Sequence, residues 1–75
     1  MNEFKLEKTC ACIKDFEYTD EQSKKTYIFH KKREYQVDVQ IVNKQIIYKV
    51  YNNGGWYDFI YLKNDVFDEY FKMII

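Results

Sequence analysis

The stretch Tyr35-Gln36-Val37-Asp38-Val39-Gln40-Ile41 decides the fold, because apolar and polar residues alternate through it without a break. Successive side chains of a β-strand point to opposite faces, so this alternation predicts a strand with one face buried. A second strand is predicted from Ile46 to Asn52, after a turn at 42–45. Two adjoining strands of this kind predict an antiparallel sheet.

The flanking segments extend this sheet. The run Asn52-Asn53-Gly54-Gly55 consists of residues that tolerate a positive φ, as tight hairpin turns require, so we expect a partner strand from Trp56 to Leu62. Towards the N-terminus, Lys8 to Ile13 is rich in residues that favour a pleated surface and is predicted as a strand. The polar stretch Asp20 to Thr26 lacks periodicity and is predicted as a loop.

The end of the sequence changes period. Its apolar residues stand at helical spacing: Phe67, Tyr70, Phe71 and Ile74. This spacing marks one face of a short helix, predicted at about 65–73. Asn64 or Asp65 is expected to cap its start, and the carboxylates of Asp65, Asp68 and Glu69 suit the positive end of its dipole.

These elements predict a mainly β fold, a small antiparallel barrel of four to five strands with a short C-terminal helix. Residues 1–75 are expected to form a single domain, because a chain of 75 residues has no room for a second. Alternation directs one set of side chains inward: Tyr35, Val37, Val39, Tyr48, Val50, Phe67 and Phe71.

Composition limits the classes of function. Twelve basic and twelve acidic residues give a formal net charge of zero, whereas a dedicated nucleic-acid binder usually carries a basic excess. No apolar run has the length of a membrane span. The sequence also begins without an apolar signal-peptide core, so we expect a cytoplasmic protein that makes no membrane contact.

The residues that usually carry chemistry are sparse. Cys10 and Cys12 share one face of the predicted strand and are interpreted as buried thiols, because a zinc site would need further ligands. A thiol paired with His30 would have no orienting acid, so a catalytic dyad is the less favoured alternative. We therefore expect no enzyme activity, no metal and no cofactor.

Four segments together carry a resemblance to a known family. They are Cys12-Ile13-Lys14-Asp15-Phe16, Phe29-His30-Lys31-Lys32-Arg33-Glu34-Tyr35-Gln36-Val37, Tyr48-Lys49-Val50-Tyr51 and Phe67-Asp68-Glu69-Tyr70-Phe71. In this order they resemble small SH3-like β-barrel proteins encoded by phages and mobile elements of low-GC bacteria. The resemblance spans about residues 8–72, and Lys32 or Arg33 stands where the family usually has a turn glycine. It implies an accessory protein that binds host or phage macromolecules, including inhibitors of bacterial defence systems.

Two candidate surfaces remain. The first is an aromatic hairpin, which we expect to bind a bacterial host protein: Tyr51, Trp56, Tyr57, Phe59 and Tyr61. Tyr and Trp are the residue types that dominate interface hot spots. The second is a basic segment within 24–33, an alternative site for nucleic acid: Lys24, Lys25, Lys31, Lys32 and Arg33. An uncovered edge strand is a template for pairing, so the sequence also leaves a homodimer open.

Overall fold

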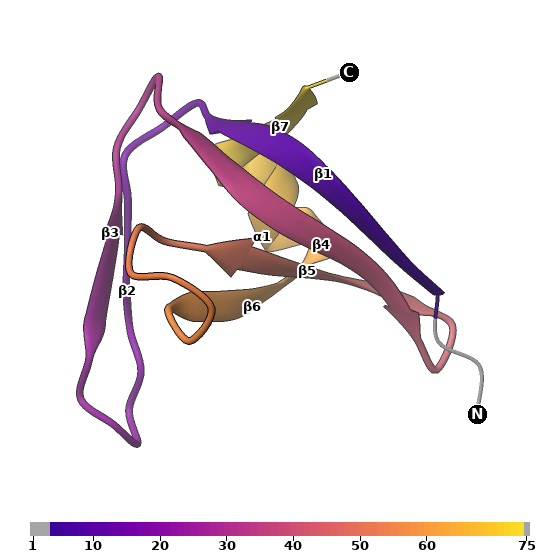
Figure 1. Ribbon diagram of the computed structural model, residues 1–75, viewed down its shortest axis with the longest axis horizontal. Helices are drawn as coiled ribbons and strands as arrows, with labels where there is room; N and C mark the ends of the chain where they lie inside the picture. Colours follow the sequence, from indigo (N-terminus) through magenta and orange to yellow (C-terminus); the bar gives the residue numbers. More distant parts are fainter. Residues whose placement is uncertain (1–3, 75) are drawn as a thin grey trace.

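The computed structural model describes residues 4–74, which form seven strands and one helix (Figure 1). The elements are β1 (Phe4–Cys12), β2 (Phe16–Thr19), β3 (Thr26–Phe29), β4 (Glu34–Val42), β5 (Gln45–Tyr51), β6 (Phe59–Lys63), α1 (Asn64–Tyr70) and β7 (Phe71–Ile74). The prediction of a mainly β fold with a short helix near the C-terminus is confirmed. The number of strands exceeds the predicted four to five.

The strands form two sheets. Five of them make one antiparallel sheet in the order β6-β5-β4-β1-β7, and β2 pairs with β3 in a separate hairpin. The hairpin stands across one end of the larger sheet, at the left of Figure 1. Neither sheet closes on itself within the described residues, so the predicted barrel is not confirmed.

The central strands follow the sequence pattern closely. β4 contains the alternating stretch 35–41, and it pairs with β5 in a register that places Val37 opposite Val50. The turn between them is shorter than predicted, because Val42 pairs with Gln45 and only two residues remain for the loop. These two, Asn43 and Lys44, have φ of 50° and 66°, the conformation of a type I′ hairpin turn.

One face of the larger sheet carries the core. The inward set predicted from alternation is confirmed: Tyr35, Val37, Tyr48, Val50, Phe67 and Phe71 are buried, and Val39 is half-buried against them. Aromatic rings pack against one another in this core, including a stacked Tyr48–Phe67 pair with centroids 3.9 Å apart. Phe29 brings the hairpin into the same core, with its ring edge-on to Phe71 at 5.4 Å.

The helix differs from the prediction at both ends. It ends at Tyr70 because Phe71–Ile74 continues as β7 and pairs with Thr9–Cys12 of β1. At its start the N-cap is Lys63, which makes no side-chain cap hydrogen bond. Asn64 instead accepts a hydrogen bond from the Tyr48 hydroxyl at 2.9 Å. Capping by Asn64 or Asp65 is therefore wrong.

One strand prediction also needs correction, and one strand was not predicted. The strand predicted from Trp56 to Leu62 begins only at Phe59, because Trp56 and Tyr57 belong to the loop that precedes it. The segment Phe16–Thr19 forms β2, which sequence patterning did not predict. This strand is short and mostly exposed, so it has no continuous buried face to produce an alternating pattern.

Candidate functional site

The loop between β5 and β6 is held in place by hydrogen bonds to its own backbone. Asp58 accepts a hydrogen bond from the Gly54 amide at 2.7 Å, and the Asn52 amide donates to the Asp58 carbonyl at 2.7 Å. A Cβ atom on Gly54 would lie 2.4 Å from the Asp58 carboxylate, so this close approach requires glycine. Gly55 has a φ of 92°, which also favours glycine. The loop is therefore ordered by its own residues.

Two further bonds tie this loop to the β2–β3 hairpin. The side chain of Asn52 donates to the carbonyl of Ile28 at 2.8 Å, and Lys25 forms an ion pair with Asp58 at 2.9 Å. The Asp58 side chain is only 13% exposed, so it joins both structures from a largely buried position. These contacts fix the distance between the hairpin and the edge of the large sheet.

The five predicted partner-binding aromatics divide into three kinds. Trp56 and Tyr57 stand on the anchored loop and are 78% and 90% exposed. Phe59 is half-buried and Tyr61 is 54% exposed, both on β6. Tyr51 is buried, and its hydroxyl donates to the Asp38 carboxylate at 2.8 Å. Tyr51 therefore has a structural role beneath the surface formed by the others.

Three of these aromatics line a cleft with residues of the hairpin. The cleft has a volume of about 280 Å³ and is lined by Tyr18, Asp20, Tyr27, Tyr57, Phe59, Ile60 and Tyr61. Tyr18 and Tyr27 lie directly opposite each other across β2 and β3, which brings their rings to 6.3 Å. We call this feature the aromatic cleft.

Sequence reasoning missed the hairpin side of the aromatic cleft. The signal that was available is a pair of short segments rich in aromatic residues, Phe16-Glu17-Tyr18 and Tyr27-Ile28-Phe29. Folding them back on each other across the polar loop gives the observed register, with Phe16 opposite Phe29. The contribution of Asp20 to the cleft depends on this pairing and has no separate sequence signal.

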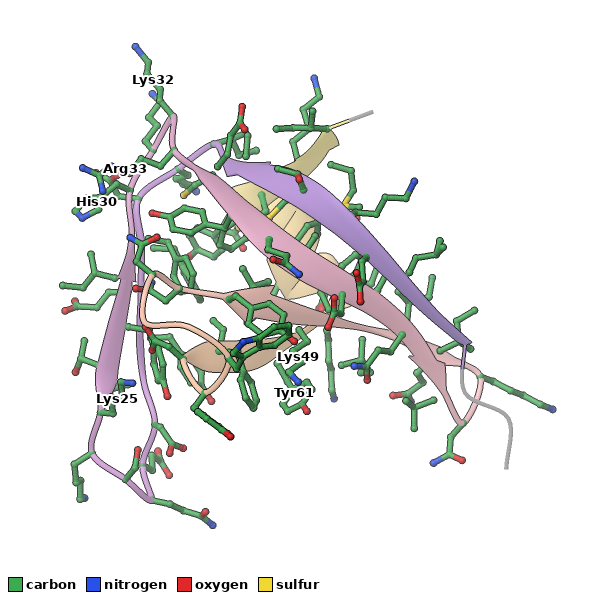
Figure 2. The ribbon with its side chains drawn as sticks, viewed as in Figure 1. Lys25, His30, Lys32, Arg33, Lys49 and Tyr61 are labelled. Carbon is green, nitrogen blue, oxygen red and sulfur yellow. The ribbon has the colours of Figure 1, made fainter. Side chains whose placement is uncertain are left out.

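Lysine ammonium groups already lie on two rings of the aromatic cleft. The Nζ atom of Lys25 is 4.9 Å from the centroid of Tyr27, and the hydrogen bond to Asp58 raises the pKa of this lysine. The Nζ atom of Lys49 is 4.1 Å from the centroid of Phe59. Figure 2 shows Lys49 beside Tyr61, its partner across the β5–β6 ladder. Two of the rings that line the cleft therefore make cation–π contacts with lysines.

The only charged side chain that lines the cleft among the described residues is Asp20. Its carboxylate accepts hydrogen bonds from the hydroxyl and the amide of Ser23 at 2.7 and 3.2 Å. These bonds, the one to the hydroxyl above all, lower the pKa of Asp20. The residue is therefore an anion at neutral pH.

The basic segment does not form one surface. Lys24 and Lys25 lie at one end of β3, and Lys31, Lys32 and Arg33 lie beyond its other end. Figure 2 shows Lys25 near the lower part of the hairpin, with Lys32 and Arg33 at the top. Because Lys25 is also paired with Asp58, the described structure offers no continuous track for a phosphate backbone.

The cysteines are buried, as predicted. Cys10 and Cys12 are free thiols on the core face of β1, and burial raises the pKa of Cys10 to about 12. In residues 4–74 no three His, Cys, Asp or Glu side chains come together in a way that would hold a metal ion. The same residues contain no helix that is long and apolar enough to cross a membrane.

No family model, curated protein or solved structure matches this chain. The binding surface is therefore inferred from the residues of the aromatic cleft and the loop beside it.

Proposed function

We propose that this protein is a non-enzymatic binding module that recognises another protein through Trp56, Tyr57 and the aromatic cleft. One observation carries the proposal. Two large aromatic side chains are 78% and 90% exposed on a loop that is itself anchored by hydrogen bonds. Folding gains little from rings held in this way, whereas a partner that covered them would gain the free energy of their burial.

The magnitudes support this reading. Burying a large apolar side chain contributes roughly 1.5–3 kcal/mol, and a few buried aromatics commonly dominate the free energy of an interface. A loop already fixed before binding avoids part of the entropic cost of ordering it. The hydrogen bond that the Gly54 amide donates to Asp58, and the ion pair of Asp58 with Lys25, provide that order in the free protein.

The class of partner comes from the family resemblance. We propose a bacterial host protein as the target and a phage or mobile element as the source of the gene, with inhibition of a host defence system as the biological role. The finer fold assignment, an SH3-like barrel, belongs to the same proposal. The hairpin that stands across the end of the sheet supports it, although the two sheets share no hydrogen-bonded ladder.

Capture from a bacterial lysate tests the proposal. The immobilised protein is compared with a Trp56→Ala, Tyr57→Ala double variant, and bound proteins are identified by mass spectrometry. Because both side chains are largely exposed, we expect the free energy of unfolding to change by less than about 0.5 kcal/mol per substitution. We expect the double variant to lose a specific protein that the parent retains.

Ile46→Ala is the matched control. Ile46 is 42% exposed and lies at the start of β5, at the opposite end of that strand from the anchored loop. This variant is expected to retain the captured protein. The proposal fails if the parent and the double variant bind the same proteins in the same amounts.

A further inference from the structure

Asp20 lines the aromatic cleft, and the ammonium groups of Lys25 and Lys49 lie over two of its rings. Lys25 is balanced by Asp58 at 2.9 Å. Lys49 lies directly opposite Asp38 across the β4–β5 ladder. Partial burial disfavours the charged form of Lys49, but the hydrogen bond and charge interaction with Tyr51, followed by the interactions with Tyr61 and Asp38, outweigh it and raise the pKa of the lysine. Among the described residues that line the cleft, Asp20 carries the only charged side chain, so its carboxylate is the charge that an incoming group meets there.

Cations already lie over some of the rings that line this cleft. Two of its lining rings, Tyr27 and Phe59, each hold an ammonium group within 5 Å of the ring centroid. Among the described residues no cation is stacked on Tyr18 or Tyr57, which line the same space. Aromatic faces attract cations through their quadrupole, and the attraction grows when the site is partly desolvated.

We propose that the aromatic cleft binds a cationic side chain of the partner protein, specifically the guanidinium group of an arginine. This inference rests on the proposed function, because it names the chemistry by which the cleft would recognise that partner. A guanidinium is planar and weakly hydrated, so it stacks on Tyr rings at a lower desolvation cost than an ammonium. Its N–H groups also match a carboxylate such as that of Asp20.

The test needs no identified partner. The peptide acetyl-Gly-Gly-Arg-Gly-Gly-amide is titrated into the intact protein, and binding is followed by NMR through the ring signals of Tyr18 and Tyr57. A second peptide carries citrulline in place of arginine, which keeps the shape of the side chain and removes its charge. We expect saturable shifts with the arginine peptide and about tenfold weaker binding of the citrulline peptide.

Two matched variants locate the charge. Asp20→Asn removes the carboxylate charge and keeps a side-chain oxygen to accept the bonds from Ser23. Glu17→Gln removes a carboxylate from an exposed position of β2 that does not line the cleft. We expect Asp20→Asn to weaken binding of the arginine peptide several-fold and Glu17→Gln to leave it unchanged. Thermal unfolding of both variants checks that the hairpin is intact.

The inference is overturned if arginine and citrulline peptides bind equally, if neither shifts the ring signals, or if Glu17→Gln weakens binding as much as Asp20→Asn. Its failure is distinguishable from failure of the proposed function. If the peptides do not bind while Trp56→Ala, Tyr57→Ala abolishes protein capture, the module recognises a partner without an arginine in the cleft. If the arginine peptide binds selectively but capture does not depend on Trp56 and Tyr57, the site stands and the proposed function fails.

Discussion

Replacing Lys32 with glycine should stabilise the protein, although it removes a side chain from a tight turn. The amide of Arg33 donates to the carbonyl of His30 at 3.1 Å, which closes a four-residue turn. Lys32 is the third residue of that turn and has a φ of 76°, and Lys31 before it is not among the described residues with positive φ. A positive φ at this position alone defines a type II turn, which favours glycine.

The turn cannot easily relax to remove this strain, because its last two residues are hydrogen-bonded to β1. The Lys32 amide donates to the Cys12 carbonyl at 2.8 Å, and the Cys12 amide donates to the Arg33 carbonyl at 2.9 Å. A left-handed conformation costs a residue with a Cβ atom about 1–2 kcal/mol. Glycine removes that cost, but it also lowers the free energy of unfolding by roughly 0.4–1 kcal/mol because the unfolded chain gains conformational freedom. The net expectation is a gain of about 0.5–1 kcal/mol.

Urea unfolding followed by circular dichroism measures this gain, and the midpoint of thermal unfolding should rise by about 2–8 °C. Lys32→Ala removes the same exposed charge and keeps a Cβ atom, so it should leave stability nearly unchanged. Lys31→Gly adds the same freedom to the unfolded chain without relieving strain and should destabilise the protein. The reasoning is refuted if Lys32→Gly is no more stable than Lys32→Ala.

Three further outcomes are expected. Tyr51→Phe should lower the free energy of unfolding by about 1.5–3 kcal/mol, because it removes a hydrogen bond to the carboxylate of Asp38, a residue that is only 1% exposed. Urea unfolding that matches the parent would contradict this. Cys10 and Cys12 should resist a thiol reagent at pH 8 in the folded protein and react fully in denaturant. Burial raises the pKa of Cys10 to about 12, so the protonated thiol is favoured in the folded state. The contribution of Cys10 to the free energy of unfolding should therefore be complete below about pH 8.5 and be lost as the pH rises towards 12. Binding to single-stranded or duplex DNA should be undetectable at low salt by fluorescence anisotropy, and salt-sensitive binding that disappears when the lysines within 24–33 are replaced would favour the nucleic-acid alternative.

The predictable part of the fold is the part with one buried face. β4 and β5 follow the sequence pattern because Val37 and Val50 lie opposite each other and are both fully buried in the core. A shift of one residue in register would expose the whole buried set, so the pattern fixes the pairing strongly. The same alternation correctly predicts that Tyr35 and Tyr48 are buried.

The parts that sequence patterning missed depend on pairing between distant segments. Phe67 and Phe71 are both buried and stand four residues apart, as on one face of a helix, yet Phe71 begins β7. What ends the helix is the ladder that residues 71–74 form with β1, more than fifty positions earlier in the chain. Local spacing holds no information about that partner, so tertiary pairing overrides the helical pattern.

Only one wall of the aromatic cleft could be predicted from the sequence. An excess of aromatics around Trp56 indicated that one face of the hairpin would be exposed, and Trp56 and Tyr57 are indeed the most exposed of the large hydrophobic side chains described. The other wall, with Tyr18 and Tyr27, depends on a two-stranded hairpin whose residues are mostly exposed. Such strands have weak periodicity, and their role appears only when the two sheets are seen together.

The two walls of the aromatic cleft belong to different sheets, and no backbone ladder joins them. Their separation is set on the core side by Phe29, which packs into the larger sheet's core, and at the surface by the bonds from Asn52 to Ile28 and from Lys25 to Asp58. Core packing holds the base of the hairpin, whereas the surface bonds hold the loop that carries Trp56. An exposed ion pair alone would contribute little, but Asp58 is largely buried and also holds the Gly54 amide. The cleft is therefore shaped in the free protein, so a partner of the proposed kind would gain the free energy of covering its rings without ordering the site first.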